Sequence, residues 1–470
     1  MQRRDLLRTC ALTAAGLFGA REWPSAEQVE EVRGRVNTAS EPSNLRITDL
    51  RVAPLYGAMR CHVIRIDTNQ GISGYGEIRD GASATYALML KGRILGENPC
   101  HVDRIFRKLK QFGGHGRQAG GVVAIEIACW DLAGKAWGVP CWQMLGGRFR
   151  DRIRIYADTT TSRDPAVMGK RLNERRARGI TFLKMDIGTW LLRGIEGAMT
   201  QPRQAGFDGF PRGRRPYVNL PHPLTGVRIT DKGVKAIQEY VLAVREVIGW
   251  DVPLAVDHLG QFTFEDAIKL AQALDPCNLA WIEDIIPWFY TDEYARIKNA
   301  CRTPILTGED IYLKEEFLKL FEKQAISICH PDLMTSGGLL ETKKIGDLAM
   351  EHGIGMAMHM AGSPVGLFAS VHCAAATENF LALECHDFDT PYYDDFVNGV
   401  PKPLVGKDGF VAVPDGPGLG IELNEAAVKE AMRRRDLDPE KEYFPPTDQW
   451  NDERAHDRIW SQAPPRTAES

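Results

Sequence analysis

Short apolar runs that each end in an ionisable residue recur along this 470-residue chain after residue 147. The eight runs end at Asp158, Asp186, Asp257, Glu283, Glu309, Asp332, His359 and Glu384. Helix-forming stretches such as FEDAIKLAQAL and KEEFLKLFEK lie between most of them. Successive run ends are 23 to 28 residues apart, except for an interval of 71 residues between the second and the third. Because a strand with its return helix takes about 30 residues in a βα barrel, each short interval predicts one βα unit.

The alternation of strands and helices predicts parallel strands joined by right-handed crossovers. Eight units of this length predict closure into a TIM-like (β/α)7–8 barrel, an α/β fold, over residues 148–389. A doubly wound open sheet is the alternative, but GISGYGE lacks its glycine spacing and lies in a predicted hairpin. The long interval holds an insertion at 188–228, which we expect to be a lid over the site or a contact between subunits.

The residues before the barrel predict a smaller α+β unit. ITDLRVAPL, CHVIRIDT and ISGYGEI predict three strands, with a turn at 69–71 between the second and the third. Helical segments are expected around 84–95 and 101–112, followed by a long apolar helix over 121–137.

The first twenty residues have the order of an export signal. Arg3 and Arg4 precede a short apolar stretch that ends in small residues, and the pattern resembles a twin-arginine signal. We therefore expect a signal peptide at 1–22, a linker at 23–44 and a periplasmic protein; an ordinary basic N-terminal helix is the alternative. The polar residues 456–470 are expected to form a tail.

Composition argues against several classes of protein. The formal net charge of −4 supplies no basic surface for nucleic acid. No apolar run approaches the roughly 20 residues of a membrane-spanning helix. The ten cysteines are too sparse for a disulfide scaffold, and none forms a CxxC pair.

Asp257, Glu283 and Glu309 end three consecutive runs. In a barrel these positions meet at the C-terminal mouth, where active sites lie, on strands about 5 Å apart. Like charges this close raise one another's pKa unless a cation is bound, and oxygen-only ligands select a hard ion such as Mg²⁺. We predict a Mg²⁺ site; the alternative is that each acid caps the following helix.

Other run ends supply candidates for proton transfer. Asp332 and His359 end neighbouring strands, and a carboxylate beside an imidazole orients the ring and raises its pKa. Lys184 lies on the same strand face as Asp186, and a metal and an apolar pocket would lower its pKa enough for it to act as a base. A simple Lys184–Asp186 pair is the alternative. Glu384 is expected to contact a substrate oxygen or the surroundings of the metal, or else to cap a helix.

Together these motifs resemble the enolase superfamily, specifically its mandelate racemase/muconate lactonizing enzyme-like branch. The resemblance rests on GYGE, AIEIACWDLAGKAWGVPCWQMLGG, FLKMD, AVDH, WIED, LTGED and HPDLMTSGGLLETKKI, which occur in the family's order and spacing. It implies a capping domain at 45–147, completed by residues 390–455, that covers the barrel.

The resemblance also implies roles for the residues that match the family's motifs. The metal ligands fall on Asp257, Glu283 and Glu309, and the catalytic dyad falls on Asp332 and His359. Two further family positions fall on Lys184 and Glu384.

The activity that the resemblance implies is removal of the proton α to a carboxylate, with Mg²⁺ stabilising the enediolate. The family's racemases carry Lys-x-Lys on the second strand, whereas this chain has Asp186 in place of the second lysine. With one strong base dyad, we expect β-elimination by an acid-sugar dehydratase that yields a 2-keto-3-deoxy acid. A racemase or epimerase, a cycloisomerase and a non-catalytic sugar-acid binding protein are the alternatives.

Substrate contacts are expected from the mouth of the barrel and from the capping loops. The candidates are Tyr56, Arg60, Asp186 and His258. The expected partner is a small-molecule carboxylate, with neither nucleic acid nor membrane, and we expect a homo-oligomer.

Overall fold

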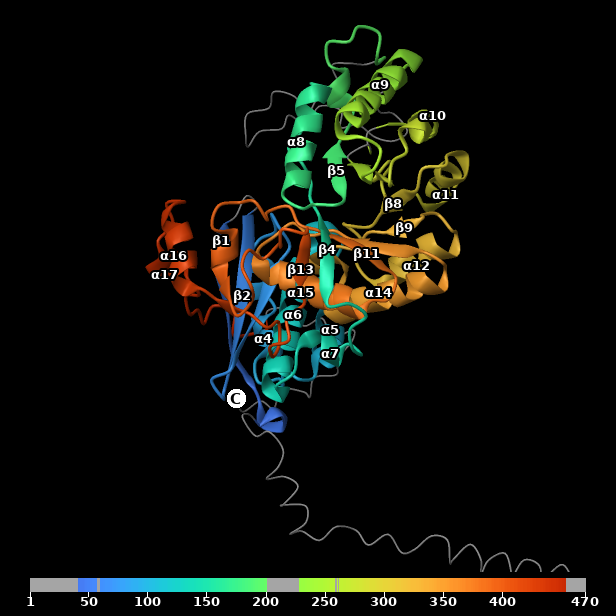
Figure 1. The fold of residues 1–470 in the computed structure, drawn as a ribbon. Helices are drawn as coiled ribbons and strands as arrows, with labels where there is room; N and C mark the ends of the chain where they lie inside the picture. Colours follow the sequence, from blue (N-terminus) through green and yellow to red (C-terminus); the bar gives the residue numbers. More distant parts are fainter. Residues whose placement is uncertain (1–40, 57–59, 201–227, 258–259, 261, 454–470) are drawn as a thin grey trace, which may run out of the picture. The chain divides into compact units, whose positions relative to one another are not determined.

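Eight parallel strands form the central sheet of the computed structural model (Figure 1). They are β4 (Arg152–Tyr156), β5 (Leu183–Asp186), β6 (Leu254–Asp257), β7 (Ile282–Glu283), β8 (Ile305–Thr307), β9 (Ile328–Cys329), β10 (Gly355–Met358) and β11 (Phe380–Glu384). Their order is β4-β11-β10-β9-β8-β7-β6-β5, and a parallel bridge between Ala157 and Leu183 joins the first strand to the second. The predicted TIM-like barrel is therefore confirmed.

The structure describes residues 41–56, 60–200, 228–257, 260 and 262–453. The predicted signal peptide, the tail, most of the linker and most of the insertion lie outside the described residues. Within the described part, no helix is long and apolar enough to span a membrane.

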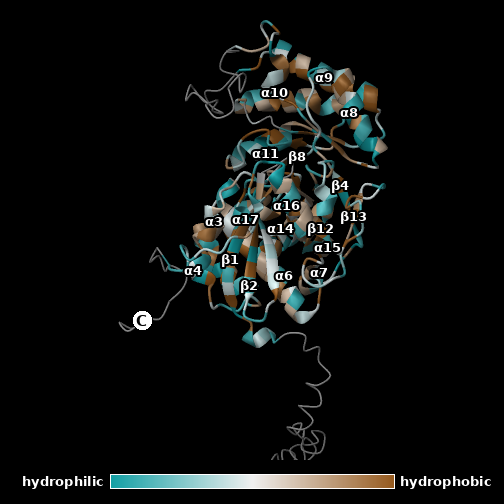
Figure 2. Cartoon of the chain, turned by 90° about the vertical axis from the view of Figure 1, so that its left-hand side faces the viewer, coloured by the Kyte–Doolittle hydropathy of each residue, from teal (hydrophilic) through white to brown (hydrophobic). Residues whose placement is uncertain are grey.

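Helices connect the successive strands of the barrel. They are α8 (Pro165–Ala177), α9 (Asp231–Ile248), α10 (Phe264–Leu274), α11 (Thr291–Ala300), α12 (Lys314–Glu322), α13 (Leu333–Ser336), α14 (Leu339–Glu351) and α15 (Pro364–Ala376). In α9, Ile237, Val241, Val244 and Ile248 recur every three or four residues and are buried, so one stripe of the helix faces the core. Figure 2 shows the resulting hydrophilic and hydrophobic bands on α9 and α10.

The smaller α+β unit is an antiparallel sheet covered by helices. Its strands are β1 (Ile47–Tyr56), β2 (Arg60–Thr68) and β3 (Ser73–Ile78), and its helices are α3 (Thr85–Leu88), α4 (Lys91–Ile94), α5 (Val102–Leu109) and α6 (Gly120–Trp137). The single helix expected at 84–95 is wrong, because the amide of Leu90 bonds to the carbonyl of Ala87 and this tight turn separates α3 from α4.

The C-terminal segment contacts both parts of the fold. Helices α16 (Glu425–Arg433) and α17 (Pro439–Glu442) lie against β1 (Figure 1). Strand β13 (Phe410–Ala412), in contrast, pairs antiparallel with β4 of the barrel. We expected the C-terminal segment to complete the capping domain. It also adds β13 to the barrel sheet, on the side of β4 opposite β11.

The GYGE motif lets β3 approach α6 closely. A Cβ atom at Gly76 would lie 1.9 Å from the carbonyl oxygen of Ala124, and one at Gly74 would lie 2.4 Å from that of Ala128. Both obstacles are helix backbone, which cannot move aside as a side chain does. Glycine is therefore required here by close packing rather than by an unusual backbone angle.

Glu77 of the same motif connects the cap to the barrel. Its buried carboxylate accepts hydrogen bonds from the amides of Ser363 at 2.9 Å and Gly366 at 2.8 Å, at the start of α15. An anion is favoured at a helix N-terminus, where backbone N–H groups are otherwise unpaired. This contact fixes the helix that follows His359.

We expect Gly76→Ala to lower the free energy of unfolding by about 1–3 kcal/mol or more, because β3 must move away from α6. Urea denaturation followed by circular dichroism measures the change. Tyr75→Phe is the matched control on the same strand, because its ring and the nearby Lys135 ammonium are retained. Equal stability of the two variants would show that the close approach is unimportant.

Candidate active site

Lys184 lies at the centre of a buried group of carboxylates at the mouth of the barrel. Its Nζ atom is 2.8 Å from Asp257 Oδ2, 3.0 Å from Glu283 Oε1 and 3.1 Å from Glu384 Oε1. All four side chains are at most 5 % exposed. They meet because β5, β6, β7 and β11 end on the same side of a closed sheet.

The charge state of Lys184 differs from the expectation. Burial alone lowers the pKa of its ammonium, but Asp257, Glu283 and Glu384 outweigh burial and raise that pKa well above the usual value. The expected lowering of the pKa applies to a site that holds a metal ion, whereas here the three carboxylates act on Lys184 directly. They take the place of the simple pair with Asp186 and favour the ammonium form, and the role of Lys184 as a base stays a prediction.

Asp284 shows how acidic this region is. Burial raises the pKa of its carboxyl, and repulsion from Glu309, Asp257 and Glu283 raises it further. Each of the three predicted metal ligands therefore lies near enough to act electrostatically on the same neighbour. Carboxylate oxygens that repel one another are the donor set that a hard divalent cation favours, so the residues fit Mg²⁺ chemically.

Glu309 nevertheless points to a different partner. Its Oε2 atom lies 3.0 Å from Nε2 of His359, and Oε1 lies 3.7 Å from Nη2 of Arg79. Among the described residues, the groups of three ligand atoms that lie within 4.8 Å of one another are Glu283–His330–Glu384 and His359–Glu384–His386. The structure thus brings Asp257 and Glu283 together and turns Glu309 toward the histidine.

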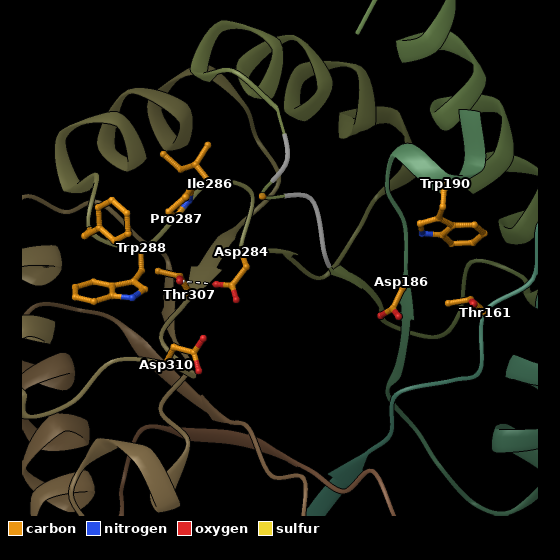
Figure 3. A pocket seen from close by; sticks show the side chains of 11 residues that line it. Thr161, Asp186, Trp190, Asp284, Ile286, Pro287, Trp288, Thr307 and Asp310 are labelled. Carbon is orange, nitrogen blue, oxygen red and sulfur yellow. Dashed lines mark hydrogen bonds between the residues drawn. The ribbon is translucent and has the colours of Figure 1, made fainter. Parts of the chain in front are cut away.

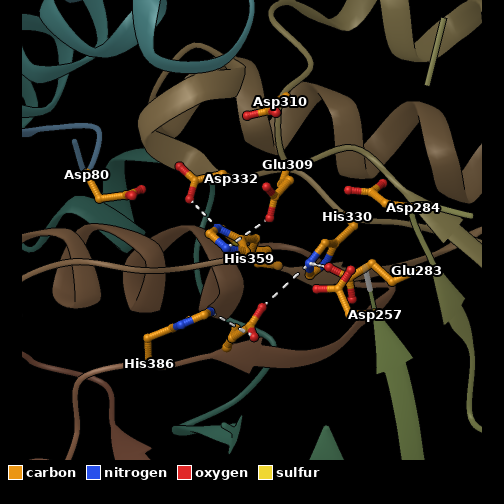
Figure 4. Close-up of polar contacts among 12 residues, drawn as sticks. Asp80, Asp257, Glu283, Asp284, Glu309, Asp310, His330, Asp332, His359 and His386 are labelled. Carbon is orange, nitrogen blue, oxygen red and sulfur yellow. Dashed lines mark hydrogen bonds and ion pairs between the residues drawn. The ribbon is translucent and has the colours of Figure 1, made fainter. Parts of the chain in front are cut away.

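Asp332 and His359 form the contact that the sequence predicts. Nδ1 of His359 lies 2.6 Å from Asp332 Oδ2, and a parallel bridge joins the two backbones beyond β9 and β10. Figure 4 shows the His359 ring between Asp332 and Glu309. Both side chains of the pair are almost completely buried.

The pKa of His359 is lowered to about 3, opposite to the expected direction. Burial is the main cause, and the Arg79 cation adds to it, while Glu309 acts in the other sense. The ring is therefore neutral at physiological pH and has a nitrogen lone pair that can accept a proton.

Three side chains at the site, Arg79, His330 and His386, are not among the residues that the sequence predicts. Arg79 reaches the dyad from the loop after β3. His330 Nε2 lies 3.0 Å from Glu283 Oε1, and His386 Nε2 lies 3.0 Å from Glu384 Oε1. Two of these had a detectable signal, because His330 opens the HPD motif and His386 follows Glu384 by two residues.

The electrostatic environment of His386 differs from that of His359. Burial lowers the pKa of His386, but the Glu384 carboxylate more than offsets this effect and the pKa rises to about 9. The two rings lie 5.4 Å apart between centroids. The site therefore holds a neutral imidazole beside a positively charged one.

A cavity of about 720 Å³ is lined by Asp186, Asp284 and Asp310, which follow Lys184, Glu283 and Glu309 closely in the sequence. Asp186 and Trp190 face Asp284, Thr307 and Asp310 across it (Figure 3). Ile286, Pro287, Trp288 and Phe289 supply an apolar wall. Carboxylates, a hydroxyl and aromatic rings around one space suit a small polar ligand with exposed C–H groups.

Of the four side chains predicted to contact the substrate, the structure describes that of Asp186. Asp186 lines the cavity. Tyr56 ends β1 and Arg60 begins β2, but their side chains lie outside the described part of the structure, as does the whole of His258. The roles of all four in binding stay predictions.

We expect Lys184→Met to lower the free energy of unfolding by about 3–5 kcal/mol at pH 7, because it leaves three buried carboxylates without their cation. Removal of the Lys184 ammonium takes away the cation that favours the charged form of these carboxyls, so, relative to the wild type, the variant loses less stability at low pH than at high pH. The deficit relative to the wild type should therefore shrink toward pH 5.

Urea denaturation at several pH values measures this deficit. Lys235→Met is the control, because that side chain is 72 % exposed. A deficit that is independent of pH would contradict the assigned charges.

Two family models match the chain. The N-terminal domain of mandelate racemase / muconate lactonizing enzyme matches residues 36–146, and an enolase C-terminal domain-like model matches residues 167–427.

Individual proteins resemble most of the chain. A D-xylonate dehydratase from Haloferax volcanii is 32% identical over 424 residues, which cover 87% of this chain and 93% of that protein. A D-galactarolactone cycloisomerase from Agrobacterium fabrum is 27% identical and covers 79% and 91%. The crystal structure of a mandelate racemase/muconate lactonizing enzyme-like protein from Rubrobacter xylanophilus matches with a TM-score of 0.69 at 31% identity, covering 83% and 98%.

Proposed function

Because this chain belongs to the mandelate racemase/muconate lactonizing enzyme branch of the enolase superfamily, we propose that it is a dehydratase of sugar acids. The observation that carries the proposal is the buried Asp332–His359 pair, whose Oδ2 and Nδ1 atoms lie 2.6 Å apart at the mouth of the barrel. The name of the relative from Haloferax volcanii supports dehydration as the reaction.

His359 is the proposed base. Asp332 holds Nδ1, so Nε2 on the other side of the ring is the nitrogen that takes the proton from the carbon next to the substrate carboxylate. Glu309 lies 3.0 Å from Nε2 and has to turn away from the ring before substrate can reach it. The protonated ring then returns this proton to the β-hydroxyl as the carbon–oxygen bond breaks. Water leaves, a double bond forms between the α and β carbons, and the enol rearranges to a 2-keto-3-deoxy acid.

Lys184 has a supporting role in this proposal. Its ammonium is held by Asp257, Glu283 and Glu384 and keeps positive charge beside the reacting carboxylate. Charge that is already in position stabilises a developing anion without reorganisation of the site.

Asp257, Glu283 and Glu309 are the residues that would hold Mg²⁺. When bound, the ion supplies the concentrated positive charge that makes the α-proton of a carboxylate acidic enough to remove. The repulsion that these acids exert on Asp284 supports the assignment.

Cycloisomerisation is the second candidate, because the relative from Agrobacterium fabrum carries that name. It also begins next to a carboxylate, but no water is lost overall. The analysis of products therefore separates the two reactions.

We expect the full chain, supplied with Mg²⁺ and a panel of pentonates, hexonates and hexarates, to release a 2-keto-3-deoxy acid from at least one of them. Mass spectrometry detects the loss of water. A product of unchanged mass would favour a cycloisomerase, and deuterium uptake from D₂O into unchanged or epimerised substrate would favour an epimerase. Absence of any conversion across the panel would count against the proposal.

In the same assay, we expect His359→Asn to reduce kcat by about 10²- to 10⁴-fold, because the acid–base group is lost. His101→Asn is the control, since this histidine is exposed at the start of α5. Full activity of His359→Asn would exclude the ring as the base.

A further inference from the structure

Arg79 is a charged side chain buried at the junction of the cap and the barrel. It follows β3 directly, and its side chain is 0 % exposed. Burial of a guanidinium is costly unless carboxylates compensate its charge. Asp332, Asp80, Glu309 and Asp310 supply this compensation and raise the pKa of Arg79 despite the opposing effect of burial.

A single atom of Arg79 contacts both members of the dyad. Nη1 forms a short ion pair with Oδ2 of Asp332 and lies 2.9 Å from Nδ1 of His359. The same Oδ2 atom lies 2.6 Å from Nδ1 of His359. With Nε2 as the base, Nδ1 donates its one hydrogen to Asp332, so Oδ2 of Asp332 accepts from both the guanidinium and the imidazole and links the two groups.

The other guanidinium nitrogens face the neighbouring acids. Nη2 lies 3.7 Å from Glu309 Oε1 and 3.9 Å from Asp310 Oδ1, while Nε lies 3.1 Å from Asp80 Oδ1. These contacts are ion pairs without a hydrogen bond to Nε or Nη2, so the hydrogen bond of the guanidinium to the dyad is made by Nη1 alone.

Arg117 provides a natural comparison at the same junction. It also comes from the cap and lies 3.3 Å from Asp80 Oδ2 and 3.2 Å from Asp310 Oδ1. Its side chain is 44 % exposed, and its hydrogen bonds and ion pairs to described residues are with Asp80 and Asp310. It acts on Asp332 only from a distance, through its charge. Loss of Arg117 therefore removes a contact between cap and barrel without removing a contact to the dyad.

We propose that Arg79 is a positioning residue that completes the Asp332–His359 dyad from the capping domain. It acts through Asp332: the guanidinium holds the buried carboxylate in one place, and the carboxylate holds the imidazole. The arginine that forms an ion pair with Asp332 comes from the loop after β3, so the contact depends on the placement of this loop. As a role in catalysis, this inference rests on the proposed function.

The first test needs no substrate. In protein with ¹⁵N-labelled histidine, the ring resonances of His359 are identified by their absence from His359→Asn. We expect Arg79→Gln to shift these resonances and Arg117→Gln to leave them in place. Unchanged His359 resonances in Arg79→Gln, or equal shifts in both variants, would overturn the proposal.

The second test is a double-mutant cycle on turnover. We expect Arg79→Gln to reduce kcat by about 10²-fold with little change in KM, because misplacement of a catalytic group by about 1 Å has this effect. Arg79→Gln combined with Asp332→Asn should be no slower than Asp332→Asn alone, because Arg79 acts through Asp332. This double variant also removes the charge of Asp332 that Arg79→Gln leaves without its ion pair, so misfolding caused by that charge is relieved in it.

Each alternative role of Arg79 gives a different result. A rise in KM at constant kcat would show that Arg79 binds substrate, and multiplicative losses in the cycle would show that it acts independently of Asp332. An equal loss of kcat in Arg117→Gln would reduce its role to docking of the cap. If the wild type converts no sugar acid, the proposed function fails, and the histidine resonances alone then decide whether Arg79 positions the dyad.

Discussion

Parallel strands that end together bring their terminal side chains into one small volume, and in this protein most of those side chains are acidic. Buried carboxylates repel one another and resist ionisation unless cations lie among them. Lys184 lies within 3.1 Å of three carboxylates, and Arg79 forms an ion pair with Asp332. The remaining features of the site follow from how these few cations are distributed among many acids.

The distribution gives two neighbouring histidines opposite properties. His386 lies against Glu384, and its pKa is raised to about 9, whereas burial and Arg79 lower the pKa of His359 to about 3. Groups of one residue type with divergent pKa values are typical of sites that move protons. His359 is the one in contact with Asp332, which is why the proposed chemistry uses it as the base.

The cap takes part in this arrangement because its own buried carboxylates attach it to the barrel. Glu77 accepts hydrogen bonds at the start of α15, and Glu126 accepts them from the amides of Leu339 and Leu340 at the start of α14. The amide of Gly116 also donates to the carbonyl of Asp310 at 2.8 Å. Attachment at several points allows a cap residue such as Arg79 to be placed against the dyad.

The sequence by itself determined the parallel barrel, the strand ends and the pairing of Asp332 with His359, because these follow from a period and from adjacency along the chain. It could not determine that Lys184 would contact Glu384 rather than Asp186, since β5 and β11 are far apart in sequence and the side chains meet only across the closed sheet. It also could not give the direction of the pKa shifts of Lys184 and His359. Those shifts depend on burial and on charges such as Arg79, which only the tertiary structure brings from the cap into the mouth of the barrel.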